Sequence, residues 1–242
     1  MSCRMRAGPS VYCRGMRHLL LAVTFVALAA AACGGGEDNG DAPVDPTQTA
    51  VGSVTAPTVS AEGVPEGWAK HEFDGVAFWT PPDYVGGPMT PDPNPTISAI
   101  GALGAGCAQS ARSLQQATSL LRFAAVDSDL CAAGSFVTNV NTAIQDAQGA
   151  TLDSFVNIYV QSLPSYIKTV ESARRVHVNG RESARISASG DVEGATFNQA
   201  IWILPDRNVF WVMIGTGAGA EFNVAVPVFE QMVALFEQSL PD

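Results

Sequence analysis

The stretch QAIWILPDRNVFWVMIGT, residues 199–216, decides the fold class. It contains two runs rich in β-branched and aromatic residues, which predict strands at 196–204 and 209–214. Only Pro205-Asp206-Arg207-Asn208 separates them, and a connection this short joins antiparallel neighbours. The two runs are therefore expected to form one long hairpin.

A second hairpin is expected immediately upstream. Residues 175–178 and 182–188 flank Asn179-Gly180, the pair that a two-residue type I′ turn prefers because both positions need a positive φ. The segment GDVEG at 190–194 supplies the next turn. Four strands joined by turns this short predict an antiparallel meander.

The first half of the domain has weaker strand signals. Strands are expected at residues 68–73, 76–79, 120–126 and 135–144. The first two flank Asp74-Gly75, another hairpin pair. Residues 83–118 begin irregularly, because the prolines of GGPMTPDPNP (residues 86–95) exclude a central strand or a helix there. A short helix is expected at 108–117.

Two longer helices complete the pattern. The apolar residues of 151–163 fall on one continuous helical stripe, with Thr151 as the expected N-cap. A closing helix is expected at 221–239, with Pro227 in its first turns or at a kink. The order of strands, helix, strand meander and helix predicts an α+β domain, in which helices flank a mainly antiparallel sheet.

The N-terminus has the three parts of a secretory signal. Four arginines and no acid precede the apolar run LLLAVTFVALAAAA (residues 19–32), which is too short to span a membrane comfortably. Cys33 follows directly, and LAAAAC resembles the lipobox of bacterial lipoproteins. We expect residues 1–32 to be removed and Cys33 to be lipidated, whichever of Met1, Met5 or Met16 starts translation.

The next segment, 33–63, has the composition of a flexible tether. It is rich in Gly, Pro, Thr and acidic residues and has no aromatic residue, so it cannot bury enough apolar surface to fold. Residues 64–242, about 180 in number, suit a single domain. Removing the four arginines of the signal changes the formal charge from −10 to −14, which disfavours a nucleic-acid partner. The expected location is extracytoplasmic, on the cell membrane.

Only two cysteines remain in the predicted domain. Cys107 and Cys131 lie on either side of the strand expected at 120–126. An oxidising compartment favours a disulfide between them, and two buried free thiols are the alternative.

Several segments resemble the PsbP-like fold and, within it, small lipoproteins of the LpqN type. The likeness lies in FDGVAFWTPPDY (73–84), VHVNGRESARISASG (176–190), QAIWILPDRNVFWVMIGT (199–216) and VFEQMVALFEQSL (228–240). The resemblance implies an α/β/α sandwich around an antiparallel sheet. It supplies no catalytic motif to transfer, and fold alone does not give function.

Candidate chemical groups have plain structural interpretations. His71 and His177 lie in different expected strands and do not form a spaced metal site. The run Gly215-Thr216-Gly217-Ala218-Gly219 lacks the lysine and spacing of a phosphate loop and fits a strand-to-helix turn. Asp127 and Asp129 fit a turn better than a calcium loop. No catalytic residue, metal site or cofactor is predicted.

The four tryptophans, Trp68, Trp79, Trp202 and Trp211, all lie in or beside expected strands. Core positions are the more common role, but Trp202 or Trp211 would also suit an exposed interface.

The leading hypothesis is a membrane-anchored, non-enzymatic binding or interaction module of the cell envelope. Its partner would be an envelope protein or an apolar small molecule held between sheet and helix. An enzyme with an unrecognised site and a structural subunit of an envelope complex remain as alternatives.

Overall fold

The computed structural model describes residues 58–59, 63–131, 136–192 and 194–238. Its main element is an eight-stranded sheet in the order β1-β7-β8-β9-β10-β6-β5-β4, and a second sheet has the order β11-β3-β2. Every strand pair is antiparallel except β1 with β7. The expected α+β class with a mainly antiparallel sheet is confirmed.

The strands are β1 (Thr58–Val59), β2 (Ala69–Phe73), β3 (Val76–Thr80), β4 (Tyr84–Pro88), β5 (Leu121–Asp127), β6 (Asn139–Asp146), β7 (Ile167–Val178), β8 (Arg181–Val192), β9 (Ala195–Asp206), β10 (Val209–Gly217) and β11 (Glu237–Gln238). The described helices are α2 (Asn94–Gly101), α3 (Ala105–Ala117), α4 (Leu152–Gln161) and α5 (Gly219–Ala234). None of these helices is long and apolar enough to span a membrane.

Two of the predicted hairpin turns form as expected, whereas those predicted at 190–194 and 205–208 are shorter, since residues 190–192 belong to β8 and 205–206 to β9. Asp74 and Gly75 join β2 to β3 with φ values of 47° and 74°, and Asn179 and Gly180 join β7 to β8 with 49° and 76°. These are the left-handed values that a type I′ turn requires at both central positions. The turns therefore set the register of their hairpins, and β9 pairs with β10 without interruption from Val209↔Asp206 to Gly217↔Asn198.

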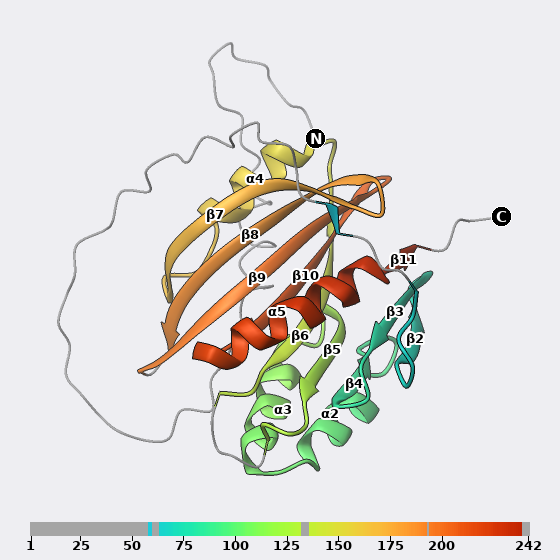
Figure 1. Ribbon diagram of the computed structural model, residues 1–242, viewed down its shortest axis with the longest axis vertical. Helices are drawn as coiled ribbons and strands as arrows, with labels where there is room; N and C mark the ends of the chain where they lie inside the picture. The colour runs from blue at the N-terminus through green and yellow to red at the C-terminus, as the bar shows by residue number, and fades with distance from the viewer. Residues whose placement is uncertain (1–57, 60–62, 132–135, 193, 239–242) are drawn as a thin grey trace, which may run out of the picture.

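Helices cover both faces of the large sheet, which makes three layers (Figure 1). On one face lie α5 and the three-stranded sheet, packed on a core that includes Trp202, Trp211 and Phe229. On the other face, α4 packs on a core that includes Ile186 and Ile201, while α2 and α3 pack on β4 and β5. The α/β/α sandwich is thus present in this chain.

The stretch 83–118 is more regular than the sequence predicted. Residues 84–88 form β4, an edge strand of the large sheet, and α2 begins at Asn94 although three prolines precede it. Both are compatible with proline chemistry: Pro88 is the last residue of an edge strand, and Pro95 occupies the first turn of the helix, where its missing N–H is not needed. The helix expected at 108–117 begins earlier, at Ala105.

Both ends of the domain also differ from expectation. Thr58 and Val59 fall inside the predicted tether, yet they form β1 on the outer edge of β7. An unpaired strand edge offers backbone hydrogen bonds, so even a polar segment gains from pairing with it. The closing helix ends at Ala234 rather than 239, because Phe236 turns into the core and Glu237 and Gln238 pair with β3. Residues 1–57, including the predicted signal and Cys33, lie outside the described residues.

Candidate ligand-binding site

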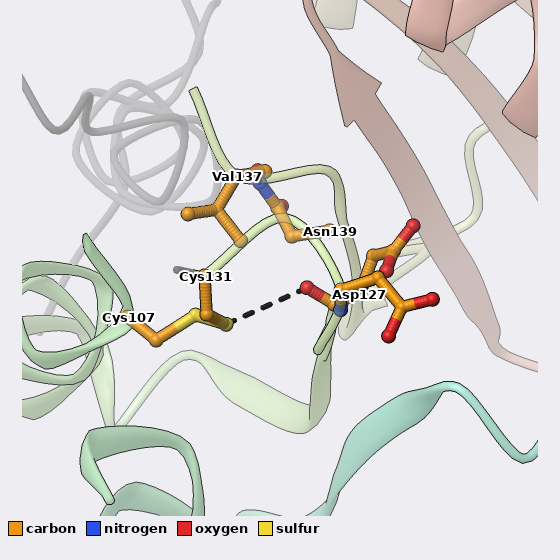
Figure 2. Close-up of a disulfide and its surroundings, with 6 residues drawn as sticks. Cys107, Asp127, Cys131, Val137 and Asn139 are labelled. Atoms are coloured by element: carbon orange, nitrogen blue, oxygen red, sulfur yellow. Dashed lines mark hydrogen bonds between the residues drawn. A yellow bond between two sulfur atoms is a disulfide. The ribbon is translucent and has the colours of Figure 1, made fainter. Parts of the chain in front are cut away.

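The two domain cysteines form the predicted disulfide, which joins α3 to the segment after β5 (Figure 2). Their Cα atoms lie 5.1 Å apart, and both residues are buried. Cys107 lies in the first turn of α3 rather than in a loop. The bond therefore holds α3 against the end of the sheet that contains β5.

Trp202 and Trp211 belong to the core, so the alternative of an exposed interface is wrong for both. Their exposed fractions are 0% and 3%. The ring of Trp211 makes edge contacts with Phe73 and Phe236, with centroids 6.1 and 5.2 Å away. Helix α5 and the small sheet cover this face, which strand alternation alone does not reveal. Trp68 and Trp79 are partly buried.

The two histidines lie in different sheets. His71, in β2, shares a hydrogen bond with the Thr80 hydroxyl at 3.0 Å and makes an edge contact with Phe123. Burial lowers the pKa of His71, so the neutral ring is favoured. His177 lies in β7, where it pairs in register with Thr58. Among the described residues, no group of three metal-ligating side chains comes together.

The glycine run spans the end of β10 and the start of α5. Gly215 lies beneath the Phe229 ring of α5, where a Cβ atom would lie only 2.4 Å from the nearest ring carbon. Gly219 begins α5 with a φ of 51°. The strand-to-helix turn is present but shorter than predicted, since residues 215–217 still belong to β10 and the change to a helix occurs at Ala218 and Gly219. Asp127 likewise forms a turn, since its carboxylate accepts the backbone N–H of Asp129 at 3.0 Å.

A row of polar side chains crosses the sheet on the face that carries α2, α3 and α4. Asn139 of β6, Thr216 of β10 and Gln199 of β9 are direct cross-strand neighbours, and Asn141 is the next residue of β6 on the same face. Gln199 and Thr216 are each 1% exposed, and Asn141 is 4% exposed. We call these four residues the polar row.

The polar row uses only part of its hydrogen-bonding capacity. The Asn141 amide donates to Asn139 at 2.8 Å, and Asn139 donates to the Val137 carbonyl at 2.9 Å. The Gln199 amide donates to the Thr216 hydroxyl over a long 3.4 Å, while its own Oε1 atom is buried without a donor. An unmet buried acceptor costs about 1–3 kcal/mol, so this arrangement favours a polar partner inside the domain.

Apolar side chains border the polar row. Ile201 and Ile214 continue the same face on one side, within the cluster under α4. On the other side Phe197 stacks on Phe136, with ring centroids 5.8 Å apart. Tyr159 projects from α4 into the same layer with its hydroxyl buried and unpaired, and burial raises its pKa, which keeps the hydroxyl protonated. Buried polar groups among apolar side chains are the combination that is typical of small-molecule binding sites.

Sequence reasoning missed the polar row. Asn139 and Asn141 alternate with apolar residues in β6, a pattern that normally indicates a solvent-facing side. The signal that was available was Gln199, a lone amide that begins the apolar run QAIWIL in the longest predicted strand pair.

Comparisons with known proteins yield likeness to solved structures only. No family model matches the chain, and no curated protein does. The solution structure of cyanobacterial PsbP (CyanoP) from Synechocystis sp. PCC 6803 is 11% identical, with a TM-score of 0.44 over 74% of this chain and 97% of that one. A Pseudomonas aeruginosa protein of unknown function is 12% identical, with a TM-score of 0.38 over 45% and 75%. A Bacteroides thetaiotaomicron structure is 12% identical, with a TM-score of 0.31 over 72% and 42%.

Proposed function

We propose that this chain is a lipoprotein of the LpqN type, held on the outer side of the cell membrane by lipidated Cys33, whose domain is a non-enzymatic binding module. Its ligand is a mainly apolar small molecule that carries a hydrogen-bonding group. The anchor is inferred from the lipobox-like LAAAAC segment and the signal that precedes it. The acidic composition argues against a nucleic-acid partner.

The polar row is the observation that carries the binding proposal. A core at this position would normally be aliphatic, because burying an amide without partners is costly. Here Gln199 and Tyr159 each have a buried polar atom without a partner among the described residues. Tyr159 of α4 belongs to the cluster on this face, and Gln199 is two residues before Ile201 of the same cluster, so both lie on the same side of the sheet. A ligand hydroxyl or amide would satisfy them, while its apolar part would lie against the neighbouring aliphatic and aromatic side chains.

The test is to identify small molecules that copurify with the protein. The protein is extracted from its native membrane in a mild detergent, and bound molecules are released with organic solvent and identified by mass spectrometry. Gln199→Leu removes the amide of the polar row at similar volume. Thr142→Val is the matched control, because Thr142 is an equally buried β6 residue with an unpaired hydroxyl on the opposite face of the sheet.

The wild type and Thr142→Val are expected to carry the same molecule in near-stoichiometric amount, and Gln199→Leu to lose it. A wild type without a bound molecule, or a Gln199→Leu variant that retains it, would contradict the proposal. In that case Gln199→Leu should be about as stable as the wild type, because it removes an unpaired buried acceptor together with only the long 3.4 Å bond to Thr216.

A further inference from the structure

Two arginines lie directly opposite each other on the face of the sheet that carries α5. Arg174 of β7 pairs in register with Arg185 of β8, and Arg185 pairs in register with Trp202 of β9. The Arg185 guanidinium lies over the Trp202 ring, 5.5 Å from its centroid. Cross-strand partners share one face, so both guanidinium groups project to the same side.

The positive charges of this pair are incompletely neutralised. Among the described residues, only Glu230 of α5 forms an ion pair with either arginine, approaching one terminal nitrogen of Arg185 at 3.6 Å, so one negative charge faces two positive ones. The Arg185 side chain is only 13% exposed, and its Nε–H is buried without an acceptor. Burial lowers the pKa of Arg185, and the Arg174 charge adds to this effect, while Glu230 opposes it. Like charges in directly opposite positions destabilise a sheet unless an anion lies between them.

The surface beside the pair is polar, and no described helix covers it. Ser187 and Ser189 continue the Arg185 side of β8, and Ser172 and Asn198 are their neighbours on β7 and β9. All four are half-exposed, and their side chains make no hydrogen bonds within the described parts of the chain. Figure 1 shows α5 crossing β9 and β10, whereas no described helix crosses β7 and β8 on this face.

We propose that Arg174 and Arg185 form a binding site for a phosphate-type oxyanion on the uncovered part of the sheet, with Ser187 as an additional donor. Paired guanidinium groups present several N–H donors in a fixed planar geometry, which suits the oxygens of a phosphate group. The Trp202 ring packs against the Arg185 guanidinium and restrains it, so this side chain loses less conformational entropy when a ligand binds. This site lies on the opposite face of the sheet from the polar row and does not depend on it.

Isothermal titration calorimetry on the protein purified in a nonionic detergent tests the site. Inorganic phosphate and dihexanoyl phosphatidylglycerol are titrated separately, in a chloride buffer, with dihexanoyl phosphatidylcholine as the neutral comparison. Arg174→Gln is the main variant, because Arg174 is exposed and its loss leaves the core intact. Arg112→Gln is the matched control, since it removes an equal charge from the exposed face of α3.

Saturable binding is expected for the wild type and Arg112→Gln, with a loss of about tenfold or more in affinity for Arg174→Gln. Glu230→Gln should strengthen binding severalfold, because it removes the competing carboxylate, and a folding defect would not produce that sign. Equal affinity for both anions identifies a free anion as the ligand, and preference for the phospholipid identifies a lipid headgroup. The proposal fails if neither anion binds, if Arg174→Gln binds as Arg112→Gln does, or if Glu230→Gln weakens binding.

Discussion

Replacing Gly215 with alanine tests the contact that joins α5 to the large sheet. The added Cβ would lie 2.4, 2.6 and 2.7 Å from three carbons of the Phe229 ring, well inside van der Waals contact. Phe229 is fully buried, so its ring cannot move into solvent. Overpacking of this kind costs about 1–3 kcal/mol, while alanine regains about 0.5–1 kcal/mol over glycine in a strand. With the middle of each range, the expected net loss in unfolding free energy is about 1 kcal/mol.

Urea unfolding followed by far-ultraviolet circular dichroism measures this loss, with an unchanged denaturant slope as the sign of an intact fold. Gly101→Ala is the control, since its new Cβ would make only an ordinary 3.5 Å contact with Ala111 within a helical pair. Phe229→Leu should relieve part of the Gly215→Ala penalty, so the two changes should be non-additive by at least about 0.5 kcal/mol. A Gly215→Ala variant as stable as the wild type, or a strictly additive double variant, would refute the close-packing argument.

Three other measurements follow from the sequence and the structure. Replacing both Cys107 and Cys131 with serine should lower the unfolding free energy by an amount on the order of 3 kcal/mol, because the disulfide closes a loop of about 25 residues in the unfolded chain. Equal urea midpoints of the wild type with and without reductant would contradict this. Cys33→Ala should abolish acylation, so labelling with a radioactive fatty acid that persists in the variant would exclude Cys33 as the anchor. The free energy of unfolding should fall as the pH drops below about 6.5. Burial lowers the pKa of His71 in the folded state, so the unfolded chain takes up the proton first. His71→Gln should flatten this pH dependence, and an unchanged pH profile in the variant would exclude His71 as its source.

The hairpins of the meander were predictable because their turns carry local information. Asn179-Gly180 and Asp74-Gly75 need positive φ values that few other residues accept, so the dipeptides alone locate the turns. Helix α4 was equally accessible, since Thr151 caps it by accepting the Ser154 N–H, as the apolar stripe and the N-cap residue indicated. These features depend on residues a few positions apart in the chain.

Elements whose formation depends on distant partners could not be predicted in the same way. Strand β1 consists of two residues in a polar segment and exists because β7 offers a free edge more than a hundred residues later in the chain. Strand β4 contains two glycines and ends in a proline, and it is held by its pairing with β5. Gly86 fits there because a side chain would collide with the backbone of Ala124 and Ala125. The residues of such segments are suited to the space available in the fold, although their intrinsic propensity to form a strand is low.

At both proposed binding sites, the alternation of polar and apolar residues along a strand predicts more solvent exposure than the structure shows. In β6, Asn139 and Asn141 have the pattern of a solvated face, and in β8 the residues Arg185 and Ser187 have it too. The surroundings of each residue decide the outcome: Asn141 is buried and Asn139 half-exposed, while Glu230 of α5 reaches Arg185 and Ser187 stays half-exposed. In the rest of the sheet, apolar residues face the core and polar residues face solvent, and this match stabilises the fold. A buried polar residue departs from that match. That disagreement costs stability at both places, so the polar row and the arginine pair are the positions where selection for binding best accounts for the residues present.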